Sequence, residues 1–226
     1  MLNSFVLPAP SMRPTVWLNC AASLDGKIAS PDGEPMPLSD EHDWRRVHRM
    51  RADADAILVG VGTIERDDPS LKVKEEYAPA SPTRKLIRVV LDSKGRTPRN
   101  ARVVDGSAPT WIVTGPGVSS KWPKAEVVPV PLVPAGAPDA QVDIGVLLNV
   151  LYQRGVRRLL VEGGSRVLRA FLDTTYVDRW TLYVAPVLIG GNGPSIFDGR
   201  PSSIGRRLHI ENVEPQGKGV LWTIRP

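Results

Sequence analysis

The fold is decided by the stretch Leu159-Leu160-Val161-Glu162-Gly163-Gly164-Ser165-Arg166-Val167-Leu168-Arg169-Ala170-Phe171-Leu172. Its first three residues form an uninterrupted apolar run, which is typical of a short strand that is buried on both faces. From Val167 onward the apolar residues recur at the spacing of one helical face. The sequence therefore predicts a strand that turns into a helix at Gly163-Gly164-Ser165, and Ser165 is the candidate cap of that helix.

A glycine pair at such a turn lets the backbone come close to a ligand. The free amides and the positive dipole end of the following helix favour an anion, and phosphate is the obvious candidate. The alternative is a tight connection without a ligand, which would be preferred for an isolated glycine pair. Glu162 favours a ligand site, because open α/β sheets bind ligands at the carboxyl ends of their strands.

Composition indicates one globular domain over residues 1–226, in which residues 1–13 form a flexible or packed N-terminal extension. The net charge of +5 does not predict a nucleic-acid partner, because the basic residues are spread along the chain and only 6% of residues are aromatic. No run approaches the roughly 18 apolar residues of a membrane span. The N-terminus also lacks a basic leader segment, so we expect a cytoplasmic protein that does not bind membranes.

Apolar runs and turn residues predict the remaining elements. A helix over 41–51 follows the cap signal at Ser39-Asp40, and a short helical turn opens at Thr63. The alternation of strands and helices predicts an α/β fold with a mostly parallel sheet, helices on both faces and a C-terminal antiparallel hairpin. Strands are expected at 15–22, 55–62, 85–91, 102–104, 109–114 and 159–161, an antiparallel edge element at 177–186, a helix at 141–154, and hairpin strands near 206–213 and 219–225.

Several common chemistries are excluded by missing motifs. The chain has no Gly-x-Gly-x-x-Gly fingerprint, Walker loop or Gly-x-Ser-x-Gly elbow. Its histidines (His42, His48 and His209) lack metal-ligand spacing, so we expect them on surfaces and expect no metal site. Cys20 is expected to be a small core residue. The remaining groups at the strand ends are amides, hydroxyls, a few cations and one acid, which suit a phosphorylated dinucleotide that carries out hydride chemistry.

Five motifs then point to a family. They are Ala22-Ser23-Leu24-Asp25-Gly26-Lys27-Ile28-Ala29, Val59-Gly60-Val61-Gly62-Thr63 with Asp67-Asp68-Pro69-Ser70-Leu71, Leu91-Asp92-Ser93-Lys94, Val161-Glu162-Gly163-Gly164-Ser165 and Ala185-Pro186-Val187-Leu188-Ile189-Gly190-Gly191. In this order the chain resembles the riboflavin-biosynthesis pyrimidine reductases over nearly its whole length. The resemblance implies a dihydrofolate-reductase-like fold, a homodimer, and NADPH-dependent reduction of the ribosyl side chain of a phosphorylated pyrimidine substrate.

By matching positions, the resemblance also implies the site residues. Glu162 falls at the substrate-facing acid and is the candidate catalytic residue, which could assist proton transfer or orient the pyrimidine. The cations Arg51 and Lys74 would suit the substrate's 5′-phosphate. The alternative, ordinary solvated charge, applies more to Lys74 than to Arg51. Ser93 and Lys94 would lie near the 2′-phosphate of NADPH. The implied substrate residues are Asn19, Arg51, Leu71, Lys74 and Glu162, and the implied cofactor residues are Ala21, Thr63, Asp67, Asp92, Ser93, Lys94, Gly163, Gly164 and Ser165.

Asn19 bears on the choice of substrate. The resemblance implies lysine at this position in the bacterial bifunctional enzymes and asparagine in archaeal and fungal reductases. An amide offers both a donor and an acceptor, which favours 2,5-diamino-6-ribosylamino-4(3H)-pyrimidinone 5′-phosphate. The alternatives are the deaminated 5-amino-6-ribosylaminouracil 5′-phosphate, a dihydrofolate-reductase-like activity, or a nucleotide- or RNA-binding module. The loop at Pro35-Met36-Pro37 departs from the bacterial pattern, so its contacts remain open.

Overall fold

The computed structural model describes residues 12–32, 36–77, 85–196 and 207–226. Residues 1–11 of the predicted N-terminal extension, Pro35 of the departing loop and residue 206 of the predicted hairpin lie outside these ranges. The strands are β1 (Thr15–Ser23), β2 (Ala56–Gly60), β3 (Ile87–Leu91), β4 (Thr110–Thr114), β5 (Glu126–Pro129), β6 (Leu132–Val133), β7 (Gln141–Val142), β8 (Arg158–Gly163), β9 (Arg179–Ala185), β10 (His209–Gln216) and β11 (Gly219–Arg225). The helices are α1 (Glu41–Asp53), α2 (Val61–Asp67), α3 (Ile144–Gln153) and α4 (Ser165–Leu172), with 3₁₀ turns η1 (Glu75–Tyr77) and η2 (Arg102–Val104).

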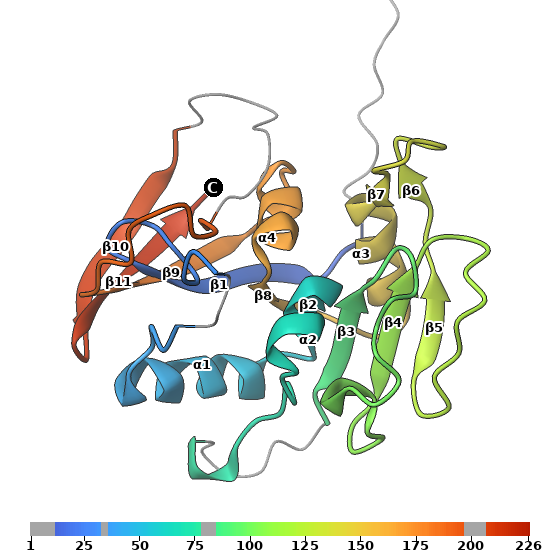
Figure 1. Ribbon diagram of the computed structural model, residues 1–226, viewed down its shortest axis with the longest axis horizontal. Coiled ribbons are helices and arrows are strands. Elements are labelled where there is room, and N and C mark those ends of the chain that lie inside the picture. The colour runs from blue at the N-terminus through green and yellow to red at the C-terminus, as the bar shows by residue number, and fades with distance from the viewer. Residues whose placement is uncertain (1–11, 33–35, 78–84, 197–206) are drawn as a thin grey trace, which may run out of the picture.

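A nine-stranded sheet runs through the molecule in the order β10-β11-β9-β1-β8-β2-β3-β4-β5 (Figure 1). Six neighbouring pairs in it are parallel, and only β11 with β9 and β10 with β11 are antiparallel among the described strands. The predicted mostly parallel sheet with a C-terminal hairpin is therefore confirmed. Strands β6 and β7 form a separate two-stranded sheet.

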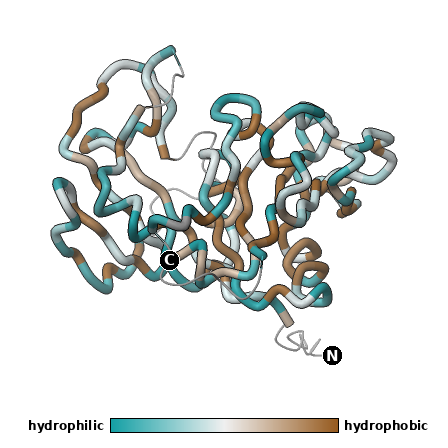
Figure 2. Tube along the Cα trace, turned by 90° about the horizontal axis from the view of Figure 1, so that it is seen from below, coloured by the Kyte–Doolittle hydropathy of each residue, from teal (hydrophilic) through white to brown (hydrophobic). Residues whose placement is uncertain are grey.

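Helices cover both faces of the sheet. Figure 1 shows α4 and α1 on opposite sides of the ribbon formed by β1 and β8. Apolar residues of α3 and α4 pack against β1 and β8 in one cluster, whereas α2 packs against β2 and β3 in a second cluster. The tube in Figure 2 is brown mainly along the central strands and teal along the outer loops, as burial of the apolar strands requires.

The helix starts differ in how they are capped. Asp40 caps α1, since its Oδ1 accepts a hydrogen bond of 2.9 Å from the amide of Asp43. In contrast, Gly164 occupies the N-cap position of α4 and Ser165 is the first helical residue, so the prediction of Ser165 as the cap is wrong. Helix α2 likewise follows a glycine and begins at Val61, two residues before the predicted start at Thr63.

Three other predicted elements are corrected by the structure. Residues 102–104 form the 3₁₀ turn η2 instead of a strand, and the predicted 141–154 helix begins only at Ile144, where Asp143 caps it. β9 is an internal strand, parallel to β1 and antiparallel to β11, although its alternating sequence predicted an edge. Its buried positions include Thr181 and Tyr183. Because these residues carry hydroxyl groups, the sequence of this internal strand alternates like that of a strand with one exposed face. Cys20 is buried as predicted.

The helices are short. The longest helix in the described ranges, α1, has 13 residues, and none there is long and apolar enough to cross a membrane. Within the same ranges no group of three or more histidine, cysteine, aspartate or glutamate side chains is arranged to hold a metal ion.

Candidate active site

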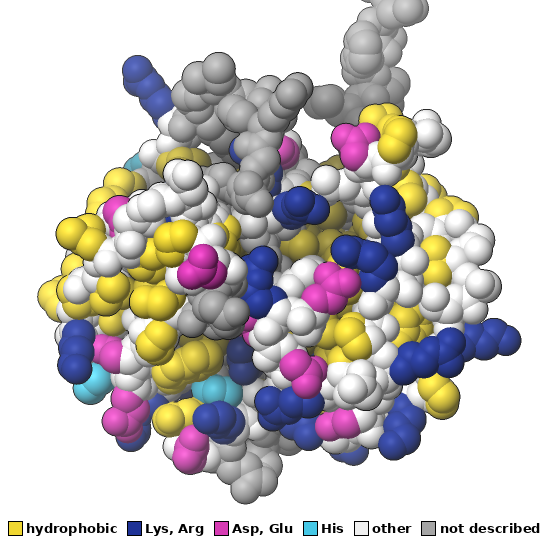
Figure 3. All heavy atoms as spheres, viewed as in Figure 1, with side chains coloured by type: hydrophobic (Ala, Val, Ile, Leu, Met, Phe, Trp, Pro, Cys, Tyr) yellow, Lys and Arg dark blue, Asp and Glu magenta, His cyan; other side chains and the backbone are white. Residues whose placement is uncertain are grey.

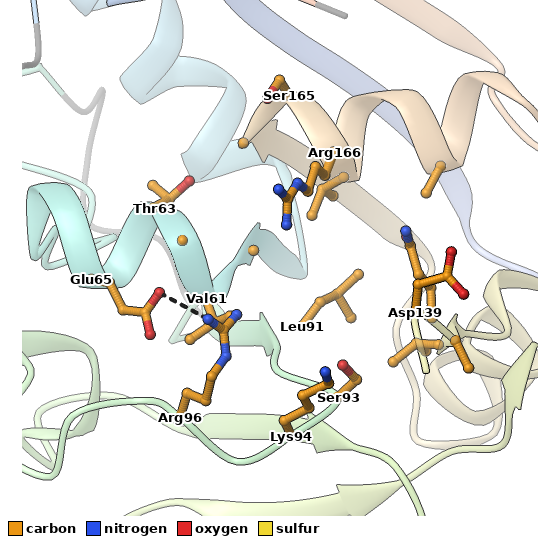
Figure 4. A pocket seen from close by; sticks show the side chains of 18 of the residues that line it. Val61, Thr63, Glu65, Leu91, Ser93, Lys94, Arg96, Asp139, Ser165 and Arg166 are labelled. Carbon is orange, nitrogen blue, oxygen red and sulfur yellow. Dashed lines mark hydrogen bonds and ion pairs between the residues drawn. The ribbon is translucent and has the colours of Figure 1, made fainter. Parts of the chain in front are cut away.

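A cavity of about 790 Å³ opens at the carboxyl ends of β2 and β3, between α2 and α4 (Figure 4). Its volume is within the range of about 300–1,000 Å³ that is usual for small-molecule and cofactor sites. Figure 3 shows lysine and arginine side chains around the hollow at the centre of this face. The cavity lies where the polar strand ends predicted a ligand at the sheet edge.

Five of the nine predicted cofactor residues line this cavity, and they come from three separate segments. Thr63 belongs to α2, Ser93 and Lys94 follow β3, and Gly164 and Ser165 form the start of α4. The first amides of a helix have no partners within the helix, so the start of α4 offers donors at the cavity wall. Such donors and the helix dipole suit a phosphate or diphosphate group.

The other four predicted cofactor residues do not line the cavity: Ala21, Asp67, Asp92 and Gly163. Asp92 is fully buried, and its Oδ2 accepts hydrogen bonds from the amide and the hydroxyl of Thr97 at 2.6 and 2.7 Å. These bonds hold the loop that carries Ser93 and Lys94. Asp92 therefore acts on the cavity through the loop conformation, and its second carboxyl oxygen, Oδ1, has no partner in the described residues.

Two arginines add positive charge to the cavity. Arg96 and Arg166 point into it from opposite walls, and Arg96 lies 3.5 Å from Glu65 (Figure 4). Two guanidinium groups in one cavity attract a phosphorylated ligand. Sequence reasoning did not assign Arg166 to the site, although its position directly after the glycine turn, in the first turn of α4, was a usable signal.

Glycines let the cavity walls approach each other. Gly163 and Gly164 adopt φ of +136° and +42°, a region that side chains rarely occupy. A β-carbon at Gly164 would lie 3.3 Å from Thr63 Oγ1, and one at Gly60 would lie 2.8 Å from Val167 Cγ2. The starts of α2 and α4 can therefore be this close only because glycine precedes each of them.

Glu162 forms a bidentate ion pair with Arg51 of α1, with Nε–Oε1 and Nη2–Oε2 distances of 2.7 and 2.6 Å. Burial opposes the charge of Arg51, but Glu162 outweighs it, and the pKa of Arg51 lies above its usual value. On the β2 side, Leu58 pairs with Val161 whereas Val59 pairs with Gly163. Glu162 is thus the extra residue of a β-bulge, a device that re-aims a side chain.

Asn19 lies on β1, the strand next to β8, and is buried. Its Oδ1 accepts hydrogen bonds from Arg46 Nη2 at 2.8 Å and from Thr181 Oγ1 at 2.9 Å. Because Arg46 and Arg51 both belong to α1, the side chains of Asn19 and Glu162 point to the same face of the sheet. The structure therefore brings these two predicted substrate residues together under α1.

The segment with the other predicted substrate residues is attached to α1 by two bonds. Arg51 Nη1 donates to the carbonyl of Lys72 at 3.2 Å, and the amide of Lys74 donates to His48 Nδ1 at 3.2 Å. Leu71 is buried with a left-handed φ of +53°, while the side chain of Lys74 is exposed and lies 3.6 Å from Glu76. The segment thus presents the side chain of Lys74 to solvent, while its backbone is held by His48 of α1.

His48 corrects another prediction. Its ring is buried between Trp44 and Tyr77, whereas His42 and His209 are exposed as predicted. Burial and then the charge of Arg51 lower the pKa of His48 to about 4, so its imidazole is neutral near pH 7. A neutral Nδ1 can accept the bond from the backbone of the substrate segment.

Comparison with known proteins decides the family. Residues 14–222 match the family model described as RibD C-terminal domain. The chain belongs to this family. Relatives of the RibD C-terminal domain support the assignment over nearly the whole chain. A protein of Archaeoglobus fulgidus named 2,5-diamino-6-ribosylamino-4(3H)-pyrimidinone 5′-phosphate reductase is 38% identical over 222 residues, which cover 95% of this chain and 99% of that protein. A protein of the same name in Methanothermobacter thermautotrophicus is 40% identical over 83% of this chain and 85% of its own length.

A solved structure shares the fold. A diaminohydroxyphosphoribosylaminopyrimidine deaminase/5-amino-6-(5-phosphoribosylamino)uracil reductase of Thermotoga maritima superposes with a TM-score of 0.78 at 30% identity. The match covers 95% of this chain and 57% of that longer protein. The predicted dihydrofolate-reductase-like fold, the predicted reductase family and the oxidoreductase class of the RibD C-terminal domain are thus confirmed.

Proposed function

We propose that this chain catalyses the NADPH-dependent reduction of the ribosyl side chain of 2,5-diamino-6-ribosylamino-4(3H)-pyrimidinone 5′-phosphate to the ribityl product, a step of riboflavin biosynthesis. One observation carries the proposal. The cavity at the sheet edge ends at the Gly163-Gly164 bend, and Glu162 directly precedes this bend in a bulge that directs it toward α1. A dinucleotide site and an acid held on the substrate side are therefore adjacent along one strand.

The cavity residues support NADPH as the cofactor. The amides at the start of α4 and the hydroxyl of Thr63 would hold the diphosphate, and Lys94, Arg96 and Arg166 offer three cations to the 2′-phosphate. When bound, NADPH supplies the hydride that reduces the sugar carbon. Binding titrations with NADPH and NADH test this preference. NADPH should bind more tightly, because only NADPH carries the 2′-phosphate that the cations would contact.

Glu162 and its surroundings support the substrate side. The bidentate contact with Arg51 keeps Glu162 in one orientation, so the carboxylate meets a bound pyrimidine without rearrangement. The fork of Arg51 is engaged by Glu162 and by the carbonyl of Lys72. Lys74 is exposed at the same segment, so it is the better-placed cation for the 5′-phosphate of the substrate.

Glu162→Gln tests the proposal. The variant keeps the size of the side chain but removes the charge that pairs with Arg51 and the proton-transfer capacity. We expect turnover to fall by about 100-fold or more, within the usual contribution of a positioned acid–base group, while NADPH affinity is retained. Glu126→Gln is the matched control, because Glu126 forms an ion pair with Arg154 away from the cavity. Near wild-type turnover in Glu162→Gln would contradict the substrate role.

The assay uses both pyrimidines and dihydrofolate, which separates the candidate substrates. Reduction of the diamino compound supports the proposal, reduction of only the deaminated compound favours the 5-amino-6-ribosylaminouracil 5′-phosphate alternative, and reduction of dihydrofolate alone rejects both. NADPH binding without oxidation by any of the three would favour a binding module. RNA affinity that falls with salt and is unaffected by NADPH would favour an RNA-binding protein.

We also propose a homodimer. β10 is an edge strand whose residues are nearly all exposed, and Ile210, Val213 and Val220 share one face of the β10–β11 hairpin with exposed fractions of 49%, 47% and 37%. Figure 3 shows hydrophobic side chains gathered on the side of the molecule where the hairpin lies. An apolar face on an edge strand suits a symmetric contact between two copies.

A further inference from the structure

The orientation of the Asn19 carboxamide is determined by its neighbours. A guanidinium group has only donors, so the Asn19 atom that lies 2.8 Å from Arg46 Nη2 is the carbonyl oxygen. The same oxygen is 2.9 Å from the hydroxyl of Thr181. Both bonds use the acceptor capacity of Asn19 Oδ1. The nitrogen, Nδ2, therefore points away from Arg46.

The donor capacity of Asn19 Nδ2 is not used by the residues that the structure describes. In the described part of the chain no group accepts a hydrogen bond from Asn19 Nδ2. The nitrogen also does not belong to the buried polar atoms without a partner, which are Asp92 Oδ1, Thr114 Oγ1 and Tyr183 OH. Within the described residues Nδ2 therefore keeps its donor capacity, although the residue as a whole is only 6% exposed.

Arg46 is itself fixed before any ligand binds. Its Nε and Nη2 lie 2.8 and 2.7 Å from Asp43 Oδ1, and Asp43 is fully buried. The other carboxyl oxygen, Asp43 Oδ2, accepts a bond of 2.5 Å from the hydroxyl of Ser39. A chain of charge-assisted hydrogen bonds therefore runs from the start of α1 to Asn19.

The same face carries a second side chain held in the same way. Leu18 on β1 pairs with Val161 on β8, so Asn19 and Glu162 follow at the same level on adjacent strands. Arg46 holds the first and Arg51 holds the second, and both arginines come from α1. Helix α1 thus sets the hydrogen-bonding character of two neighbouring substrate residues.

We propose that Arg46 and Thr181 are positioning residues that present Asn19 to the substrate as a hydrogen-bond donor only. This inference rests on the proposed function, because the atom opposite Asn19 belongs to the pyrimidine. That atom is therefore a hydrogen-bond acceptor of the pyrimidine and not one of its amino groups. The hypothesis that Asn19 uses both its donor and its acceptor is thereby replaced.

Steady-state kinetics with both pyrimidines test the donor role directly. Asn19→Asp removes the donor at constant size, and we expect kcat/KM to fall by about 30-fold for each pyrimidine that the wild-type enzyme reduces. A loss smaller than about threefold would overturn the donor role of Asn19. NADPH affinity should stay within twofold, because Asn19 does not line the cavity.

A double-mutant cycle tests positioning by Arg46. Arg46→Met should raise KM about tenfold, Arg46→Lys should restore part of this loss, and Arg49→Met on the exposed face of α1 should have no effect. In an Asn19→Ala background, Arg46→Met should raise KM only slightly further, because Arg46 acts through Asn19. An equal loss in both backgrounds would show that Arg46 acts independently and would overturn the inference.

Thr181 provides a variant that leaves the buried Asp43 paired. Thr181→Val removes one of the two donors to Asn19 Oδ1, and Thr181→Ser keeps it. The side-chain ¹⁵N–¹H signals of Asn19 should shift in Thr181→Val and Arg46→Met but not in Arg49→Met. Unchanged Asn19 signals in Thr181→Val and Arg46→Met would overturn the positioning role. This readout needs no turnover, so a wild-type enzyme that reduces neither pyrimidine would refute the proposed function separately.

Discussion

Gly164→Ala tests the glycine bend most directly. The backbone of Gly164 has φ +42° and ψ +143°, which alanine adopts only with strain, and the new β-carbon would lie 3.3 Å from Thr63 Oγ1. Backbone strain of this kind costs about 1–3 kcal/mol. The variant can relieve it in two ways: it can keep the bend and lose stability, or it can open the bend and displace the amides that line the cavity.

These two outcomes have different measured sizes. If the bend is kept, thermal unfolding shifts down by about 2–4 °C for each kcal/mol in a chain of this length. If the bend opens, NADPH affinity falls by about fivefold for 1 kcal/mol and by about 100-fold or more for 3 kcal/mol. We expect the second outcome to dominate, because the start of α4 has no side-chain cap to hold it. Fluorescence titration with NADPH and calorimetric melting measure both quantities.

Gly155→Ala is the matched control. Gly155 also has a positive φ, +92°, with open space at its β-carbon, but it ends α3 and does not line the cavity. Its substitution should lower the melting temperature and leave NADPH affinity unchanged. If Gly164→Ala binds NADPH like the wild-type enzyme and only melts earlier, as Gly155→Ala does, the bend does not hold the cofactor and our reasoning about the cavity is refuted.

Two further predictions concern His48 and the hairpin. The unfolded chain binds a proton at His48 near pH 6.5, whereas the folded chain does so only near pH 4, so stability contributed by this site is present above about pH 6.5 and is lost as the pH falls toward 4. Between pH 7 and pH 4 the free energy of unfolding, measured with urea, should therefore decrease less for His48→Gln than for the wild type. Equal decreases would contradict the burial of a neutral imidazole. For the homodimer, light scattering should give a mass of twice 24.6 kDa for the wild type and a lower mass for Val213→Lys. Lys218→Glu at the hairpin turn is the control and should keep the wild-type mass. A wild-type monomer would contradict the homodimer.

The elements that could be predicted from the sequence are those with strong local signals. The β8–bend–α4 unit combines an apolar run, two glycines and a helical face within 14 residues, so its prediction needed no distant information. The helix start at Asp40 was equally local, because a side-chain cap and the amide it binds are three residues apart. By contrast, Val103 and Val104 suggested a strand, but their segment is a three-residue 3₁₀ turn in which both side chains are buried.

The site was predicted as separate residues but not as contacts. Arg51 and Glu162 were both assigned to the substrate, yet the ion pair that joins them links positions 111 residues apart and leaves no local pattern. The bonds from Arg46 and Thr181 to Asn19 span 27 and 162 residues, so the sequence left both the donor and the acceptor of the amide available. Asp92 was matched to a cofactor position, but its bonds to Thr97 are those of a buried turn.

The central place of β1 has a consequence for synthesis of the protein. β1 precedes the other described strands in the chain, but its two neighbours in the sheet are β8 and β9, which are separated from it by more than half of the sequence. At about 5–20 residues per second, the nascent chain therefore exposes an apolar strand for on the order of 10 s or more before its partners exist. Chaperone binding during translation should thus centre on the unpaired β1 segment, and slowed elongation should increase aggregation more than it does for proteins whose strands pair with near neighbours in sequence.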